Sequence, residues 1–312
     1  MSPLTSSLGI RLKSILIATD FSKASEGPLR HALGIARHYG AKPYLTHVVS
    51  SFGFTMAGRE SLLAATDSAW REAQDLERSL LIKRELDGFD YEIVIRQGNL
   101  WEELKEVIDQ GHVDLVVVGT HGRRGSGKLL LGSVAEKIFC HAPCPVLMVG
   151  PCAFQESRIE SIGVPRPILF PADFGEASLR ALPCAIAFAD QRRVKLVLLH
   201  VLPDVPVSAA SLHWCTPSNF EQLQETTRAA TLERLEELIP PNAKLALQPE
   251  LVVQFGFQAA DVILQTAEVR HGEVIVMGLD RPDHLTFPSH FRLTTAYQVV
   301  CSAACPVLTT RN

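Results

Sequence analysis

The sequence predicts an α/β protein of two tandem domains, each an open, twisted, five-stranded parallel sheet with helices on both faces. Three observations predict this class. Short continuous apolar runs alternate with segments in which apolar residues recur at helical spacing. The same order of motifs occurs twice along the 312 residues. A glycine-containing loop follows the fourth apolar run, at the edge where such sheets bind ligands.

The first copy is expected to read strand, helix, strand, long helix, strand, helix, strand, helix, strand. Its strands are expected in apolar runs, which lie within residues 14–22, 44–49, 93–98, 114–118 and 145–149. The first helix is expected over residues 25–36, where one face carries Leu29, Ala32, Leu33 and Ala36. Another helix is expected over residues 134–139, directly after the glycine-containing loop.

The second copy repeats these motifs in the same order. The equivalent runs are residues 167–175, 197–202, 251–256, 274–278 and 305–308. The offset between the copies drifts only from 153 to 161 residues, which indicates one fold duplicated with short insertions. We therefore expect domains at residues 1–151 and 166–312, joined by a polar linker at 152–165. In the second copy, a helix over residues 226–238 is expected to bury Ala229, Leu232, Leu235 and Leu238.

The composition is typical of a soluble globular protein, with 46% hydrophobic and 21% charged residues. The net charge of −4 and the pI near 6.3 argue against nucleic acid or an anionic membrane surface as the main partner. No apolar run reaches the roughly 18 residues of a membrane span. The N-terminus lacks the basic-then-apolar pattern of a signal peptide. A cytoplasmic location without membrane attachment is therefore expected.

Seven cysteines, an odd number, do not suit a closed disulfide framework. Cys140 and Cys144 are spaced i, i+4, and so are Cys301 and Cys305. This spacing fits either a metal site or small buried hydrophobes at a helix end and a strand start. A proline follows each pair, which favours the second interpretation because it suits a helix-to-strand turn.

The loop after the fourth strand is the most informative motif. It carries Gly119 and Gly122, then nine residues, then Gly132 and Ser133. Glycines let backbone N–H groups approach phosphate oxygens, and the helix that follows offers unpaired donors and a favourable dipole. The Gly-Lys-Ser/Thr sequence of a P-loop is absent, and no dinucleotide fingerprint opens the first strand. The loop therefore predicts a nucleotide phosphate site of another type.

These motifs resemble those of the universal stress protein family, and the first copy is similar to its ATP-binding branch. The resemblance rests on residues 19–22 (TDFS), 47–48 (HV), 118–122 (VGTHG) and 132–134 (GSV). It extends over nearly the whole chain as two tandem copies. It implies a Rossmann-like fold of the adenine nucleotide alpha hydrolase type, with ATP, alone or with Mg²⁺, as the ligand.

The resemblance also implies which residues hold the nucleotide. Near the adenosine it places Ala18, Asp20 and Val48. Along the ribose and phosphates it places Val118, Gly119, Gly122, Gly132, Ser133 and Val134. Basic residues inside the loop could neutralise phosphate charge, namely Arg123, Arg124 and Lys128.

Several of these residues have a structural alternative. Asp20 can instead cap the first helix, Ser133 can cap its own helix, and the basic loop residues can face solvent. His121 is not expected to be catalytic, because the sequence places no carboxylate or nucleophile to orient it. His47 and His200, at the ends of equivalent strands, are expected to be hydrogen-bonded core residues. No catalytic or metal-binding residue is predicted.

The second copy departs from the pattern. Asp280 enters its loop, Arg281 replaces the second glycine, and Leu293 and Thr294 stand where the first copy has its third glycine and serine. A leucine side chain would block the approach of a phosphate to the backbone, and the carboxylate would repel its charge. The second copy is therefore expected not to bind ATP.

The last strand of each copy lies at a sheet edge that needs covering. The resemblance implies that these strands pair, because the family commonly dimerises through them. Residues 145–149 and 306–310 are then expected to pair within one chain, as an intramolecular pseudo-dimer. A further homodimer of whole chains is left open.

The function expected from these features is ATP binding in the stress response, through nucleotide-dependent binding or signalling. Two alternatives remain. One is a slow ATP hydrolase or nucleotidyl-transfer enzyme of the same fold. The other is an interaction scaffold that binds no nucleotide.

Overall fold

The first half of the chain alternates strands and helices in the expected order. The computed structural model describes residues 12–50, 58–120, 131–154, 166–204, 217–280 and 294–311. The strands of the first half are β1 (Ser14–Ala18), β2 (Lys42–Ser50), β3 (Glu92–Gly98), β4 (Leu115–Gly119) and β5 (Val146–Val149). Its helices are α1 (Lys23–Tyr39), α2 (Gly58–Ile82), α3 (Leu100–Gln110), α4 (Ser133–His141) and the short 3₁₀ helix η2 (Pro151–Phe154).

The second half repeats this order and adds one short helix. Its strands are β6 (Ile168–Pro171), β7 (Leu196–Pro203), β8 (Glu250–Gly256), β9 (Val274–Gly278) and β10 (Val307–Thr310). Its helices are α5 (Glu176–Arg192), α6 (Pro217–Glu237), α7 (Pro241–Leu247), α8 (Ala259–Val269) and α10 (Thr295–Ser302). Helix α7, between α6 and β8, has no counterpart among the helices described in the first half and was not predicted.

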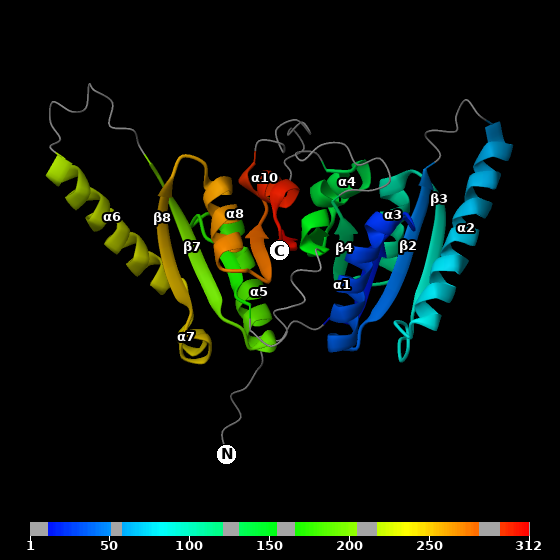
Figure 1. The fold of residues 1–312 in the computed structure, drawn as a ribbon, viewed down its shortest axis with the longest axis horizontal. Helices are drawn as coiled ribbons and strands as arrows, with labels where there is room; N and C mark the ends of the chain where they lie inside the picture. The colour runs from blue at the N-terminus through cyan, green and yellow to red at the C-terminus, as the bar shows by residue number, and fades with distance from the viewer. Residues whose placement is uncertain are drawn as a thin grey trace, which may run out of the picture.

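The ten strands of the described residues form one sheet, in the order β3-β2-β1-β4-β5-β10-β9-β6-β7-β8. Each half contributes five parallel strands, as expected, and the two halves meet where β5 and β10 pair antiparallel (Figure 1). Val307 pairs with Met148 and Leu308 with Leu147. This is the strand pairing expected from the sequence. Helices α2 and α6 both begin at the top of Figure 1, so the strands before them end on the same side.

The winding of each half reverses beside its first strand. In the first half β1 lies between β2 and β4, so the chain moves outward to β3 and then returns to the other side of β1. In the second half β6 lies between β7 and β9 in the same way. Ligands of such sheets bind beyond the carboxyl ends of the strands at this reversal. The fold therefore provides two equivalent positions for a site.

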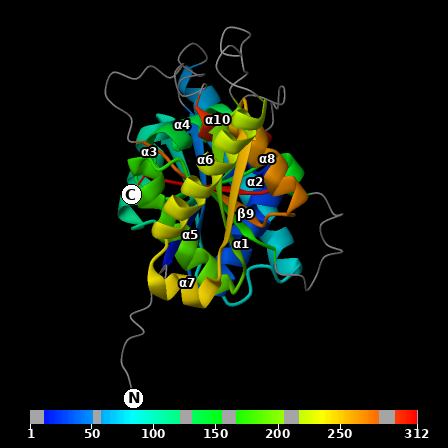
Figure 2. The same ribbon diagram turned by 90° about the vertical axis from the view of Figure 1, so that its left-hand side faces the viewer.

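Two hydrophobic clusters cover the two faces of the sheet. Alternate strand residues supply them: Ile15 and Ile17 belong to one cluster, Leu16 and Ala18 to the other. The first cluster includes residues of α1, α5 and α6, and the second includes residues of α3, α4, α8 and α10. Figure 2 shows α6 on one side of the sheet and α8 on the other. Both clusters contain residues of both halves, so the halves share their core.

The helix faces agree with the sequence for α1 and differ for α6. The four apolar residues expected on the core side of α1 are all buried. In α6, Leu235 is buried as expected, whereas Ala229 is exposed. Thr231 is buried instead, and its hydroxyl donates to the carbonyl of Thr227 at 2.7 Å. That hydrogen bond satisfies the hydroxyl within the helix, so a polar residue can occupy the buried face.

None of the described helices is both long and apolar enough to cross a membrane.

Candidate functional site

The carboxyl ends of β1 and β4 bring several predicted site residues together. Ala18, the last residue of β1, pairs with Val118 on β4, and both are almost fully buried. Gly119 ends β4 directly beyond this pair. Val48 lies half-buried on the neighbouring strand β2, two residues beyond the partner of Ala18. These four residues therefore line one stretch of the sheet edge at the reversal of the winding.

Asp20 organises the turn between β1 and α1. Its Oδ1 accepts hydrogen bonds from the backbone N–H of Ser22 at 3.0 Å, from the Ser22 hydroxyl at 2.6 Å and from the Ser25 hydroxyl at 2.5 Å. Phe21 takes a left-handed conformation in this turn, with φ of 59°. These three contacts hold the turn before α1, but none of them is to a backbone N–H of the helix, whose N-cap residue is Ser22. They place the carboxylate at the same sheet edge as Ala18.

The histidines at the ends of β2 and β7 have matching surroundings. The Nδ1 atom of His47 lies 2.8 Å from the carbonyl oxygen of Thr19, and that of His200 lies 2.6 Å from the carbonyl oxygen of Ala172. Because a carbonyl only accepts, each Nδ1 carries the proton. Each ring also packs against the phenylalanine that follows the first strand of its half, with centroids 5.2 Å and 4.7 Å apart. The expected hydrogen bond of both histidines is confirmed, whereas both side chains are half-buried and not part of the core.

The glycine-containing loop is described only at its two ends. Residues 121–130 lie outside the described part of the chain, and with them the predicted residues Gly122 and Arg123. At the ends, the backbone N–H of Gly132 donates to the carbonyl of Thr120 at 2.8 Å, and the N–H of Thr120 donates to Val149 at 3.0 Å. The N–H of Gly132 is therefore engaged within the chain, which leaves the first turn of α4 to supply donors.

No described side chain caps the start of α4. Gly132 is the N-cap residue of this helix, and it has no side chain that could accept a hydrogen bond from the first turn. Ser133 and Val134 follow and are exposed. The first N–H groups of a helix have no carbonyl partner within it, and the helix dipole adds a partial positive charge there. This arrangement favours an anion.

The equivalent helix start in the second half is capped by a side chain. Thr294 is the N-cap residue of α10, and its side chain accepts a hydrogen bond from the backbone N–H of Tyr297 at 3.3 Å. The carboxylate of Asp280 lies just beyond β9, 4.0 Å from the guanidinium of Arg180. Residues 281–293, which include Arg281 and Leu293, lie outside the described part of the chain. The threonine cap makes this helix start a poorer anion site than that of α4.

Sequence reasoning missed a packing reason for the glycine after the fourth strand. A Cβ atom placed on Gly278 would lie 2.1 Å from the carbonyl oxygen of Ala177 and 2.7 Å from the nitrogen of Ser178. The first turn of α5 therefore packs directly on the backbone of β9. This explains why the second half keeps this glycine although the rest of its loop differs. Gly119 occupies the equivalent position at the end of β4.

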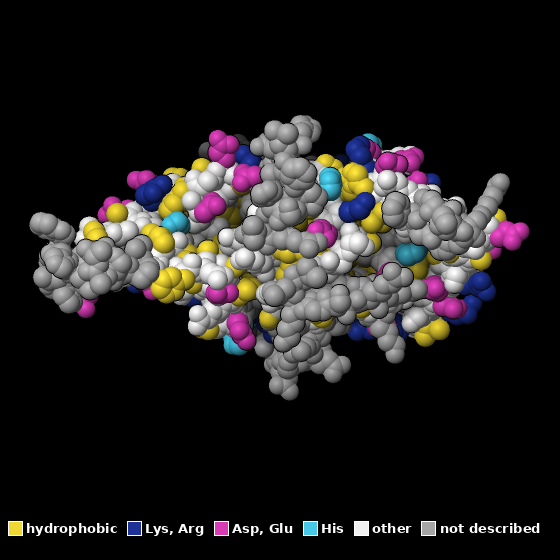
Figure 3. All heavy atoms as spheres, turned by 90° about the horizontal axis from the view of Figure 1, so that it is seen from above, with side chains coloured by type: hydrophobic (Ala, Val, Ile, Leu, Met, Phe, Trp, Pro, Cys, Tyr) yellow, Lys and Arg dark blue, Asp and Glu magenta, His cyan; other side chains and the backbone are white. Residues whose placement is uncertain are grey.

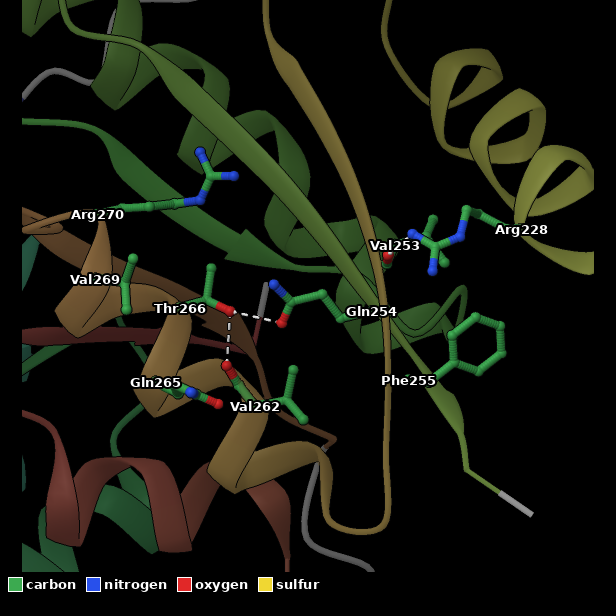
Figure 4. Close-up of a pocket in the computed structure, with 9 residues that line it drawn as sticks. All are labelled: Arg228, Val253, Gln254, Phe255, Val262, Gln265, Thr266, Val269 and Arg270. Carbon is green, nitrogen blue, oxygen red and sulfur yellow. Dashed lines mark hydrogen bonds between the residues drawn. The ribbon is translucent and has the colours of Figure 1, made fainter. Parts of the chain in front are cut away.

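The two cavities described lie away from the predicted residues. One, of about 530 Å³, lies at the amino ends of β1 and β2 beside Lys13 and Lys42. The other, of about 520 Å³, opens at the edge strand β8, with Arg228 and Phe255 on one side and Thr266 on the other (Figure 4). Neither includes a residue predicted to hold a nucleotide.

Within the described residues, no three His, Cys, Asp or Glu side chains gather in a way that could hold a metal ion. Four of the cysteines at the helix-to-strand turns are unbridged thiols, and all but Cys144 are fully buried. Burial raises the pKa of the Cys144 thiol to about 11. These observations agree with cysteines that act as small core residues.

Charges of both signs are interspersed on the side of the molecule where α2 and α6 begin. Figure 3 looks onto this side, and its described basic, acidic and hydrophobic side chains are mixed without a broad patch of one sign. An extended basic surface of the kind that binds nucleic acid is therefore not seen among them.

The comparisons with known proteins agree with the fold and the duplication. The model of the universal stress protein family matches residues 11–150 and again residues 165–311. A universal stress protein of Methanocaldococcus jannaschii is 32% identical over 138 residues, which cover 44% of this chain and 81% of that protein. A second one from the same organism is 27% identical over 157 residues, covering 46% of this chain and 97% of that protein.

A solved structure matches the whole chain. The crystal structure of a universal stress protein from Archaeoglobus fulgidus superposes with a TM-score of 0.66 at 19% identity and covers 98% of both chains. The chain belongs to the universal stress protein family, as a tandem form with two copies of its domain. Family membership supports a role in the stress response.

Proposed function

We propose that this protein binds ATP in its first half and acts in the stress response through nucleotide-dependent binding or signalling. The observation that carries the proposal is the difference between the two helix starts. The N-cap residue of α4 is a glycine, with exposed residues after it, whereas the N-cap residue of α10 is a threonine whose side chain caps the helix. The loop motifs of the first half support the same choice.

The described residues suggest how the nucleotide would be held. The backbone N–H groups of Ser133 and Val134, with the Ser133 hydroxyl, would donate to the phosphates. Ala18, Val48 and Val118 offer an apolar surface for the adenosine, and the Asp20 carboxylate could accept hydrogen bonds from its hydroxyl or amino groups. With no acidic cluster among the described residues, any Mg²⁺ would be held by the phosphates and water.

In this proposal the second half is an internal partner, and the chain is a pseudo-dimer. Pairing between β5 and β10 supports this idea, because it covers the last strand of each half with the other. Domain boundaries near residues 151 and 166 are part of the same proposal. We infer no catalytic residue in this site.

The test adds one negative charge at the start of each equivalent helix. In the Ser133→Glu variant, a carboxylate stands where the phosphates would bind, and we expect ATP affinity to fall by at least about tenfold in calorimetric titration. Stability should hold or rise slightly, because a carboxylate in the first turn of a helix is favourable by about 0.3–1 kcal/mol. The matched control is Thr295→Glu, which adds the same charge to α10 and should leave ATP affinity unchanged.

Unchanged ATP affinity in Ser133→Glu would refute the assigned site. Loss of binding in Thr295→Glu alone would move the site to the second half. If the wild-type protein binds no ATP, the scaffold alternative replaces the proposal. Rapid release of phosphate on mixing with ATP would instead favour the enzyme alternative.

A further inference from the structure

Two side chains of the second half reach helix α4 of the first half. The hydroxyl of Tyr297, on α10, accepts a long hydrogen bond of 3.4 Å from the backbone N–H of Leu131. Its ring packs edge-on against Phe139, with centroids 6.0 Å apart. Arg311, directly after β10, donates from Nη2 to the carbonyl oxygen of Phe139. Leu131 lies two residues before α4, and Phe139 lies in the last turn of α4. The second half therefore contacts both ends of this helix.

The Arg311 contact has a physical reason in the helix itself. The last carbonyls of a helix have no partner within it, and a cation near them interacts favourably with the helix dipole. Arg311 provides this cation from the other half of the chain. Its guanidinium also lies over the Phe139 ring, 5.9 Å from the centroid. Arg311 is only 8% exposed and Tyr297 only 3%, so both contacts are within the core and shielded from water.

Among the described residues, the contacts of Tyr297 and Arg311 with α4 have no counterpart from the first half to the second. By the offset of the Cys-Pro-Val-Leu motifs, the first-half equivalents of Tyr297 and Arg311 are Glu136 and Gly150. Neither offers an aromatic ring or a guanidinium. At Gly150 a Cβ atom would already lie 3.3 Å from the carbonyl oxygen of Ala303, so a larger side chain has little room there. The shared backbone pairing is symmetric, but these side-chain contacts are not.

We propose that Tyr297 and Arg311 are positioning residues for the nucleotide site of the first half. They hold α4 through Leu131 and Phe139, so that the N–H groups at its start stay where the phosphates bind. The part that concerns ATP rests on the proposed function, whereas the hold on α4 does not. The second half, whose own loop departs from the binding motif, thus acts as the support of the first.

The experiment uses the full chain with the conservative variants Tyr297→Phe and Arg311→Met. Hydrogen exchange of the amides in residues 131–141 is measured by mass spectrometry without nucleotide, and ATP affinity is measured by calorimetry. We expect faster exchange in both variants. ATP affinity should fall about 2- to 5-fold in Tyr297→Phe and about 3- to 10-fold in Arg311→Met, the range of one net hydrogen bond. Arg311→Lys, which keeps a cationic donor, should recover part of the loss.

The matched control is Tyr39→Phe. Its hydroxyl makes another hydrogen bond between the halves, to Gln191 at 2.6 Å, but it belongs to α1 and α5 on the opposite face of the sheet. We expect neither exchange in residues 131–141 nor ATP affinity to change in this variant.

The two readouts separate the ways in which the proposal can fail. Unchanged exchange in both variants would show that the second half does not hold α4. Faster exchange with unchanged ATP affinity would overturn the positioning role, while the proposed function stands. If wild type binds no ATP, the proposed function fails, and the exchange measurement alone supports or overturns the hold on α4.

Discussion

The carboxylate of Asp20 faces two demands at once. It accepts three hydrogen bonds through Oδ1 within the turn that leads into α1, and the proposed function also gives it a nucleotide to hold. The sequence allowed both roles, because an aspartate after a strand suits a helix start as well as a ligand. Only the structure shows that three donors within the turn already bond to Oδ1 of Asp20.

Two substitutions at this position separate the roles. In Asp20→Ala all three acceptor contacts are lost, and we expect a loss of about 1–3 kcal/mol of stability, because partly buried donors lose their acceptor. Asp20→Asn keeps an oxygen acceptor but loses the charge, so it should cost less stability than Asp20→Ala. Its ATP affinity should nevertheless fall about 3- to 10-fold, since hydrogen bonds to an ionised group are roughly twice as strong.

The control for Asp20 is its equivalent in the second half. Asp173 accepts a hydrogen bond from the backbone N–H of Gly175 at 2.9 Å. Asp173→Ala should lower stability without changing ATP affinity. Should Asp20→Asn bind ATP as tightly as wild type, the residue serves the turn alone.

At the scale of elements, the sheet was predicted well and one helix face was not. Strands that are buried on both faces have continuous apolar sequences, so the order of the strands along the chain could be predicted from the sequence. The prediction that Ala229 lies on the buried face of α6 was wrong, because a small residue such as alanine fits either face of a helix. Burial of Thr231 depends on its hydrogen bond to Thr227, which a hydrophobicity pattern does not encode.

The edge strand β8 carries a charge cluster with a predictable pH dependence. Glu250 lies 2.6 Å from Arg270 and 3.1 Å from Lys195. Burial pushes the pKa of Glu250 upward, but the hydrogen bonds and charges of Lys195 and Arg270 outweigh it and hold the pKa below its ordinary value. A carboxylate with a lowered pKa stabilises the fold above its unfolded pKa, about 4.3. That stability is lost as the pH falls through the folded pKa.

We therefore expect wild type to be more stable than Glu250→Gln at pH 7, and the difference to shrink below about pH 4.3. Denaturant midpoints measured between pH 7 and pH 3 check this. The control is Glu221→Gln, an exposed position on α6, whose midpoint should follow wild type throughout. A gap between wild type and Glu250→Gln that stays constant as the pH falls would contradict the assigned ion pairs.

At the scale of the whole molecule, the halves share a core across the β5–β10 pairing. Leu308 on β10 lies opposite Leu147 on β5. It is 4% exposed and belongs to a cluster with residues of both halves. A substitution that removes side-chain atoms at Leu308 should therefore destabilise both halves of the molecule.

We expect Leu308→Ala to cost about 2–5 kcal/mol of stability and to lower the unfolding midpoint of the first half, although Leu308 belongs to the second. In a Trp214→Phe background, the remaining tryptophans, Trp70 and Trp101, report on the first half alone. Their fluorescence and the far-UV circular dichroism should shift together. Leu245→Ala, at a position 84% exposed, serves as the control and should change neither signal. Two separate transitions, with fluorescence unshifted, would show that the halves unfold independently.

The candidate site was predictable only in part, and distance along the chain explains the rest. The order of the strands predicted that Asp20, Val48 and the loop at Gly119 share one sheet edge, because parallel strands bring their carboxyl ends together, and the family resemblance added Ala18 and Val118. The contacts of Tyr297 and Arg311 with α4 join residues 166 and 172 positions apart. No spacing rule connects such residues, since their meeting depends on how the two halves join.

The antiparallel seam at the centre of the sheet also alters how this protein responds to dilution. Two separate single-domain chains would fall apart once their concentration dropped below their dissociation constant. Here the linkage is covalent, so each half meets the other at an effective concentration that does not fall when the protein is diluted. A cell holding only a few copies of this protein would still hold every one of them assembled.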